Sequence, residues 1–291
     1  MQKRLPLGHI QLEGGKKPVY AFDDFFLNYT FEKKDNWEAL RLIINILLEA
    51  YSLECPGTVL EPITDDIIVT TRFKNYMKNR HKPKEQDIEV KEVNLIRFTY
   101  IEMQNDAFPE KPVEIQAVEY SVINISRNIG HISNQIWLVA GGISKLFHGR
   151  TFANYLLKEE SSGKPYPNAS CILFINLRKL SKEKTVAGEL ASFLLGKTRA
   201  IKSGEAKQIS DVFRKSCRNF CKDEGVKNNM SVKQKWQHEA KMEGKIEGKI
   251  EGKKEGIEEG IQQGIQQGAA RIAELIKAGL SPDEALEKVC N

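Results

Sequence analysis

Two carboxylates and an amide lie at the ends of two neighbouring strand-like segments. Asp87 begins the segment 87–93, and Glu102 and Gln104 end the segment 95–104. Side chains two residues apart in a strand point to the same face, so Glu102 and Gln104 project together. Because only a short turn separates the two segments, we expect an antiparallel hairpin that brings Asp87 level with Glu102.

Carboxylate and amide oxygens that converge in this way make a site that suits Mg²⁺ or Mn²⁺. Such a metal would polarise a scissile phosphate and lower the pKa of a bound water, as phosphodiester hydrolysis requires. The spacing alone also describes exposed strand ends that carry ordinary charges. Glu102 lies within an otherwise apolar strand, which favours a charge that is used or paired, because a buried charge is otherwise costly.

The surrounding sequence predicts alternating helices and strands. Apolar residues recur at helical spacing from Trp37 to Leu48, with Asp35 or Asn36 as the N-cap, and the segment 67–71 is β-branched and strand-like. Further strands are expected at 135–140 and 170–177, and further helices at 113–129, 185–195 and 203–221. This pattern predicts an α/β fold.

Composition indicates a protein of a reducing compartment. The 291 residues are 41% hydrophobic, enough for an ordinary core, and the five cysteines are too few and too scattered for a disulfide framework. Cys217 and Cys221 share a helix face and are interpreted as ordinary helix residues. No signal peptide begins the sequence, and the longest apolar stretch, 42–48, is too short to span a membrane. We expect a cytoplasmic protein.

Positive charge is concentrated in one part of the chain. The net charge is +5, but residues 145–239 contain 19 Lys and Arg against 9 Asp and Glu. A basic region beside a carboxylate site suits a protein that binds a polyphosphate backbone, and a solvated surface is the alternative. A Walker-type nucleotide loop is lacking, so no nucleotide cofactor is expected. The candidate DNA-binding residues are Lys179, Lys182, Lys184, Lys197, Arg199 and Lys202.

The C-terminal part has a different character. Glycines recur every four residues from Gly244 to Gly268, so they would form a slowly winding stripe on a helix. Two interpretations compete for residues 231–268: a marginal helix stabilised by homo-oligomerisation, or an extended linker. Residues 269–291 then predict a helical hairpin with a capping box that begins at Ser281. Residues 1–230 would form the main domain.

Several segments together resemble a known family. They are Gln86-Asp87-Ile88 with Tyr100 to Gln104, Phe22 to Phe31 followed by Trp37 to Arg41, Asn176 to Leu180, and the glycine-punctuated tail. With these segments the chain is similar to the PD-(D/E)XK family transposases and the recombination-promoting nucleases of the Rpn type. The resemblance covers most of the chain, although only the part from Asp87 to Gln104 is chemically specific.

The resemblance implies a restriction-endonuclease-like core, a mixed sheet flanked by helices, and Mg²⁺-dependent DNA cleavage linked to recombination or transposition, with Mn²⁺ as a substitute metal. It implies that Asp87 and Glu102 are metal ligands and that Gln104 orients water or contacts the phosphate. Asp24 matches the acidic residue of the family's first helix, and the adjacent Asp23 is the alternative.

In the group that the chain resembles, the usual Glu-x-Lys is commonly Glu-x-Gln, as Glu102-Met103-Gln104 is here. A glutamine amide supplies no positive charge and accepts no proton, so a weaker or more metal-reliant mechanism is expected. The rival hypothesis is a catalytically degenerate protein that keeps the nuclease fold, binds DNA and oligomerises through its C-terminal helix.

Overall fold

The computed structural model describes residues 4–57, 60–73, 87–95, 97–104, 111–140, 145–156, 160–163, 170–279 and 281–290. The chain divides into two compact units, Met1–Met230 and Ser231–Asn291.

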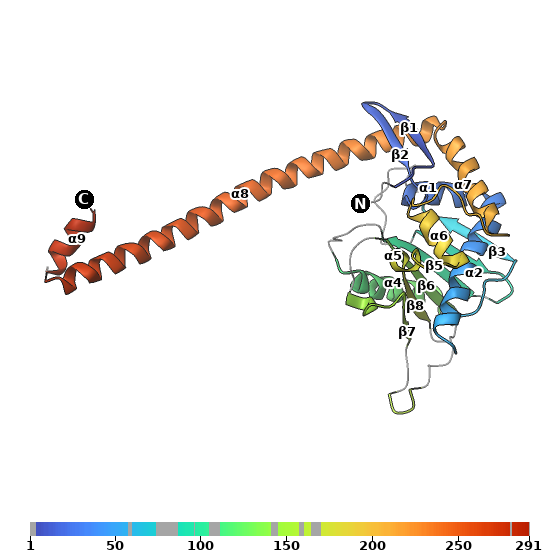
Figure 1. Ribbon diagram of the computed structural model, residues 1–291, viewed down its shortest axis with the longest axis horizontal. Helices are drawn as coiled ribbons and strands as arrows, with labels where there is room; N and C mark the ends of the chain where they lie inside the picture. The colour runs from blue at the N-terminus through green and yellow to red at the C-terminus, as the bar shows by residue number, and fades with distance from the viewer. Residues whose placement is uncertain are drawn as a thin grey trace. The chain divides into compact units, whose positions relative to one another are not determined.

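A six-stranded mixed sheet forms the centre of the first unit, in the order β3-β4-β5-β6-β8-β7 (Figure 1). β3, β4 and β5 form an antiparallel meander, β5, β6 and β8 run parallel, and β7 pairs antiparallel with β8. The predicted α/β class and the predicted hairpin are therefore confirmed. The strands are β3 (Ile67–Thr71), β4 (Ile88–Glu92), β5 (Arg97–Gln104), β6 (Ile132–Val139), β7 (Phe152–Leu156) and β8 (Cys171–Asn176).

Helices cover both faces of this sheet. Their apolar faces form a large core with Ile101 and Met103 on one side, and a smaller cluster with Trp137 and Phe174 on the other. The large core is built by α1 (Asp24–Phe31), α2 (Trp37–Glu54), α5 (Leu177–Leu180), α6 (Val186–Leu194) and α7 (Lys207–Phe220); α4 (Val113–Arg127) covers the smaller cluster. Short helical turns at Lys34–Asn36 and Lys145–Phe147 and a separate hairpin of β1 (Gly8–Leu12) and β2 (Gly15–Val19) complete the unit.

α4 differs from its prediction in the way it packs. Helical spacing places Val118, Ser121, Val122 and Ile125 on one face. Of these, the Ser121 hydroxyl accepts a hydrogen bond from the Gln135 amide, whereas the three apolar side chains are 58%, 65% and 47% exposed. The helix contacts the sheet through Val113 and Ala117 instead. Small contact residues let α4 lie close to the polar and aromatic side chains on this face of the sheet, which include Gln135 and Trp137. The helix also ends at Arg127, two residues before the expected end.

An ion pair fastens the turn end of the β4–β5 hairpin. Arg97 pairs through its Nε with Glu92, and its Nη2 lies 2.9 Å from Glu92 Oε1 and 2.8 Å from the Pro62 carbonyl oxygen. Glu92 Oε1 also accepts the Thr64 backbone N–H at 2.9 Å. Both charged side chains are buried, so the pair ties the connection before β3 to the hairpin and fixes the register of the two strands.

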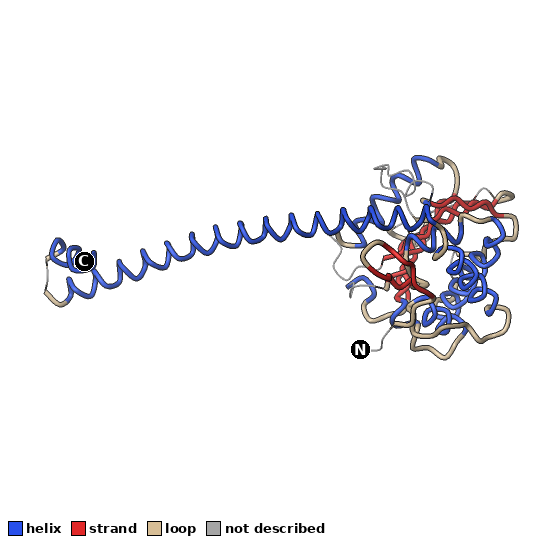
Figure 2. The backbone as a smooth tube through the Cα atoms, turned by 90° about the horizontal axis from the view of Figure 1, so that it is seen from above, coloured by secondary structure: helices blue, strands red, loops and turns tan. Residues whose placement is uncertain are grey.

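The C-terminal unit is helical in the part that the structure describes. α8 (Glu224–Lys277) is an unbroken helix through the glycine stripe (Figure 2), which corresponds to the helical interpretation of that segment. Gly279 has a φ of 98°, and the Ser281 backbone N–H and hydroxyl both bond Glu284 before α9 (Pro282–Cys290). The capping box expected at Ser281 is therefore present at the start of α9. None of the described helices is long and apolar enough to cross a membrane.

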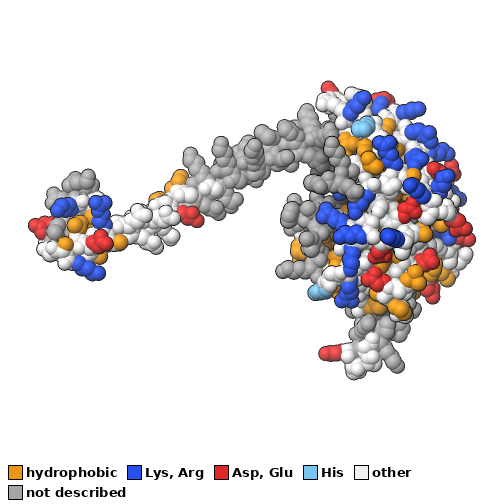
Figure 3. All heavy atoms as spheres, viewed as in Figure 1, with side chains coloured by type: hydrophobic (Ala, Val, Ile, Leu, Met, Phe, Trp, Pro, Cys, Tyr) orange, Lys and Arg blue, Asp and Glu red, His pale blue; other side chains and the backbone are white. Residues whose placement is uncertain are grey.

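Basic side chains gather on one face of the first unit. Figure 3 shows Lys and Arg over α5, α6 and α7 on the face in view. Arg214, Lys215 and Arg218 of α7 line one shallow depression there, and Lys184 and Lys202 line another beside α6. The basic segment of the sequence therefore forms a surface of the folded unit rather than part of its core.

Candidate active site

Three neighbouring strands place Arg72, Asp87 and Glu102 side by side in one row across the sheet. Because Thr71 pairs with Ile88 and Ile88 pairs with Ile101, the adjacent positions Arg72, Asp87 and Glu102 face one another in turn. Directly opposed residues of antiparallel strands have Cβ atoms about 5 Å apart. The register thus brings Asp87 level with Glu102, as the hairpin prediction required, and adds an arginine beside them.

Backbone hydrogen bonds hold the two carboxylates in the row. The Asp87 N–H donates to Glu102 Oε2 at 3.1 Å, and the Met103 N–H donates to Asp87 Oδ2 at 3.1 Å. Asp87 and Glu102 are both buried. Each carboxylate is therefore oriented by the backbone beside the other residue, which makes the pair rigid and mutually dependent.

Arg72 is the residue of the row that sequence reasoning missed. Its Nη1 lies 3.5 Å from Asp87 Oδ1 and its Nη2 lies 3.7 Å from Glu102 Oε2. Its backbone N–H donates to Asn28 Oδ1 at 2.7 Å and to the Asp87 carbonyl oxygen at 3.3 Å. The signal in the sequence was an arginine directly after the predicted strand 67–71, which becomes informative once that strand is paired with the hairpin.

In the row, the carboxylates of Asp87 and Glu102 share one positive charge, that of Arg72. Burial raises the pKa of Glu102 well above its usual range, and the charge of Asp87 raises it further. Arg72 and the Asp87 backbone N–H oppose this rise, and Asp24 adds to it. The site therefore favours a positive charge between its two carboxylates.

The raised pKa of Glu102 predicts a pH dependence of stability without metal. A carboxyl whose pKa is higher in the folded state contributes stability below its ordinary pKa of 4.5 and loses that contribution as the pH rises through the folded value. In EDTA, Glu102→Gln should therefore be more stable than the wild type at neutral pH, whereas the two should converge near pH 4. Urea denaturation from pH 4 to 8 measures the free energy of unfolding of both proteins. The same dependence on pH for the wild type and Glu102→Gln would contradict the prediction.

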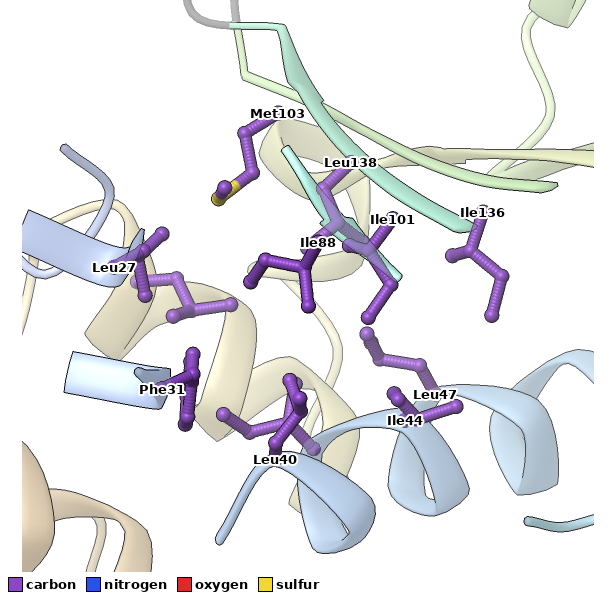
Figure 4. A pocket seen from close by; sticks show the side chains of 12 residues that line it. Leu27, Phe31, Leu40, Ile44, Leu47, Ile88, Ile101, Met103, Ile136 and Leu138 are labelled. Carbon is purple, nitrogen blue, oxygen red and sulfur yellow. The ribbon is translucent and has the colours of Figure 1, made fainter. Parts of the chain in front are cut away.

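The opposite face of β5 is apolar. Ile101 and Met103 alternate with the site residues and point toward α1 and α2, where they line a cavity of about 20 Å³ with Ile88, Ile136 and Leu138 (Figure 4). All of the lining side chains are apolar, so this cavity offers no partners for water or an ion. The polar chemistry is thus confined to the α4 side of the sheet.

Tyr120 and Trp137 form a wall beside the row on the α4 side. Trp137 is the strand neighbour of Glu102 in β6, and Tyr120 stacks on it with ring centroids 5.7 Å apart. Burial raises the pKa of Tyr120, the charges of Glu102 and Asp87 raise it further, and Arg72, hydrogen-bonded to the hydroxyl, lowers it. The Tyr120 hydroxyl of α4 therefore contacts the Arg72 guanidinium, as the two carboxylates also do.

The remaining expected residues lie close to the row. Gln104 is two positions beyond Glu102 on β5, on the same face, and is buried. Asp24 is the first residue of α1, and its charge acts on Glu102. Asp23 instead caps α1, since its Oδ1 accepts the Phe26 N–H at 3.1 Å. Asp24 thus matches the expected site residue in that its charge acts on Glu102.

The donor set fits a small divalent cation. Mg²⁺ usually takes one or two carboxylates from a protein and completes its shell with water and substrate phosphate, and Asp87 and Glu102 are two such carboxylates. A guanidinium already lies against both of them, which shows that their field attracts a cation. Over the described ranges, no three or more His, Cys, Asp and Glu side chains converge as they would in an all-protein metal cage.

The six expected DNA-binding residues fall into separate groups. Burial lowers the pKa of the Lys197 amine, and the nearby positive charges of Lys182 and Arg178 lower it further. Lys184 and Lys202 line one depression together with Glu183 and Glu189. The Lys179 amine donates to the Gly149 carbonyl oxygen, and the Arg199 carbonyl oxygen accepts from Arg214. The surface is therefore basic but interspersed with carboxylates.

The sheet brings this basic surface to the same edge as the site. Gln104 pairs with Val139, and Val139 pairs with Asn176, so three parallel strands end together. Neighbouring strands lie about 4.8 Å apart, which puts the Asn176 backbone about 10 Å from that of Gln104. Asn176 caps α5, the helix that carries Arg178. A polyanion bound over α5 would thus start close to the row.

Comparisons of the chain with protein-family models, with curated proteins and with solved structures gave no match.

Proposed function

We propose that this protein is a metal-dependent DNA endonuclease with a restriction-endonuclease-like core, which acts in DNA recombination or transposition. The observation that carries the proposal is the buried row in which Asp87 and Glu102 lie against each other and against a cation. The row also holds an acid with a strongly raised pKa, because Glu102 is buried beside Asp87 and the charge of Asp24 acts on it, as is typical of functional sites.

The residues of the row have distinct roles in the proposed reaction. Asp87 and Glu102 would hold Mg²⁺ or Mn²⁺, which when bound supplies charge neutralisation and a water of lowered pKa. Gln104, on the same face, would orient that water or contact the phosphate through its amide. Basic residues over α5, such as Lys182, would hold the DNA backbone without reading its sequence. Cleavage with little sequence preference follows from this division of roles.

The rival function is DNA binding and assembly without catalysis. Gln104 in place of a charged residue and the arginine against both carboxylates favour it, since both features weaken a hydrolytic site. The two functions differ in what the wild-type protein does to a bound duplex. Both predict salt-dependent DNA binding, because both use the basic surface.

The experiment that separates them measures binding and cleavage on the same end-labelled duplex. The purified wild type should bind in EDTA, with an affinity that falls steeply with salt, and should cut only after Mg²⁺ or Mn²⁺ is added. Binding without cleavage in either metal would favour the assembly protein. Absence of salt-sensitive binding would contradict both proposals.

We also propose that α8 mediates self-association, as the glycine stripe suggests. Ile257, Ile261 and Ile265 are exposed along the helix, and a bare glycine stripe lets a partner helix approach closely. Sedimentation equilibrium should show an oligomer for the wild type that dissociates in Ile257→Lys/Ile265→Lys. A monomeric wild type at tens of micromolar would contradict this prediction.

A further inference from the structure

We propose that Arg72 supplies the positive charge that Gln104 cannot: in the metal-free protein it neutralises Asp87 and Glu102, and in the working site it contacts the substrate phosphate. This inference rests on the proposed function, because it assigns a substrate contact at the same site. Arg72 is neither on β5 nor near Gln104 in sequence. It follows the end of β3, so its positive charge lies on the β3 side of the row, whereas Gln104 lies on the β5 side.

The guanidinium of Arg72 is placed to act on both carboxylates. Arg72 lies next to Asp87 in the row, and its two terminal nitrogens reach different carboxylates, Nη1 that of Asp87 and Nη2 that of Glu102. Both separations, 3.5 and 3.7 Å, exceed those of a good charge-assisted hydrogen bond, about 2.8 Å. The guanidinium therefore lies between the carboxylates as a shared counter-charge rather than as a tight fork on one of them.

The backbone of Arg72 is fixed, and its side chain is partly exposed. Asn28, which is buried in α1, accepts the Arg72 N–H at 2.7 Å, and the neighbouring strand binds it as well. The side chain of Arg72 is 22% exposed, in contrast to 4% for Asp87, although its Nη2 atom is buried against the carboxylates. Rotation of this side chain alone would carry the guanidinium toward a substrate without any movement of the strand.

A guanidinium and a divalent cation that compete for the same two carboxylates repel each other, so Arg72 lowers the affinity of the row for metal. A substrate phosphate removes that conflict, because it offers the guanidinium a bidentate partner of its own. Arg72 thus couples the two ligands: metal binds weakly without DNA and tightly with it.

The test compares Arg72→Gln, Arg72→Lys and, as an arginine outside the site, Arg41→Gln in the full-length protein. Mn²⁺ binding is measured without DNA from the electron paramagnetic resonance signal of free Mn²⁺, and cleavage is measured under single turnover at saturating Mn²⁺. We expect Arg72→Gln to bind Mn²⁺ about tenfold more tightly, since it removes a nearby positive charge, and to cleave about a hundredfold more slowly, since it removes a phosphate contact.

The controls separate charge from structure. Arg72→Lys should keep the weak Mn²⁺ affinity of the wild type and recover only part of the cleavage, because an amine keeps the charge but not the fork. Arg41→Gln should change neither. An arginine that only neutralised the two carboxylates would tighten metal binding when removed but would leave the rate of cleavage unchanged. If Arg72→Gln fails to fold, Arg72→Lys decides alone, and cleavage at the wild-type rate by Arg72→Lys would overturn the inference.

The possible failures are distinguishable. Unchanged or weaker Mn²⁺ binding by Arg72→Gln, with active wild type, overturns the role of Arg72 and leaves the nuclease proposal standing. Tighter binding with undiminished cleavage overturns the phosphate contact. If the wild type binds Mn²⁺ but never cuts DNA, the proposed function fails, whereas tighter binding by Arg72→Gln would still establish the competition.

Discussion

Asp87→Asn should lower the rate of Mg²⁺-dependent DNA cleavage by about three orders of magnitude. The substitution keeps the shape of the side chain and an oxygen for the Met103 N–H, but it removes one of the two charges that would hold the metal. Loss of several kcal/mol of metal-derived stabilisation corresponds to a rate reduction of this size. Single-turnover cleavage of a labelled duplex measures it.

The control for this prediction is Asp65→Asn. Asp65 is an exposed aspartate that pairs with Arg41 away from the row, so its removal should leave cleavage within about twofold of the wild type. In EDTA, Asp87→Asn should not destabilise the fold, because it relieves the repulsion that raises the pKa of Glu102. Full activity of a folded Asp87→Asn variant would contradict the assignment of the site.

Arg97→Met should destabilise the first unit by about 3–5 kcal/mol. The substitution leaves Glu92 buried and charged without its main partner, and this imbalance is far more costly than the loss of an exposed ion pair. The Pro62 carbonyl oxygen also loses its donor. Urea denaturation of the full-length protein, followed by tryptophan fluorescence from the buried Trp137, measures the change in the free energy of unfolding.

Arg41→Met is the matched control for Arg97→Met. Arg41 forms an ion pair with Glu38 at 2.7 Å on the surface of α2, so its removal should cost no more than about 1 kcal/mol. Equal losses in the free energy of unfolding for the two variants would show that the buried Glu92–Arg97 pair stabilises the hairpin no more than an exposed ion pair does.

The hairpin that carries the site could be predicted because local rules determine it. A short turn joins two strand-like segments, and period-two geometry then puts Glu102 and Gln104 on one face and Asp87 opposite Glu102. The strand 67–71 was predicted with its observed bounds, since five β-branched residues in succession favour a strand in any context.

Arg72 could not be predicted, because its role depends on which strand pairs with the hairpin. That pairing is a long-range choice made by packing against α1 and α2, and no local pattern encodes it. The same limit applies to α4. Helical spacing predicts which side chains share a face, and Val118 and Val122 do, but it does not predict that this face is exposed.

The most direct test measures Mn²⁺ occupancy and DNA cleavage in the same titration, for the wild type and Asp87→Asn. We expect wild-type cleavage to rise in proportion to the occupancy of one site and to be absent in EDTA, and we expect Asp87→Asn to bind Mn²⁺ much more weakly and to cleave about a thousandfold more slowly. Wild-type cleavage that persists in EDTA, or a fully occupied wild type that leaves DNA intact, would contradict the proposed function.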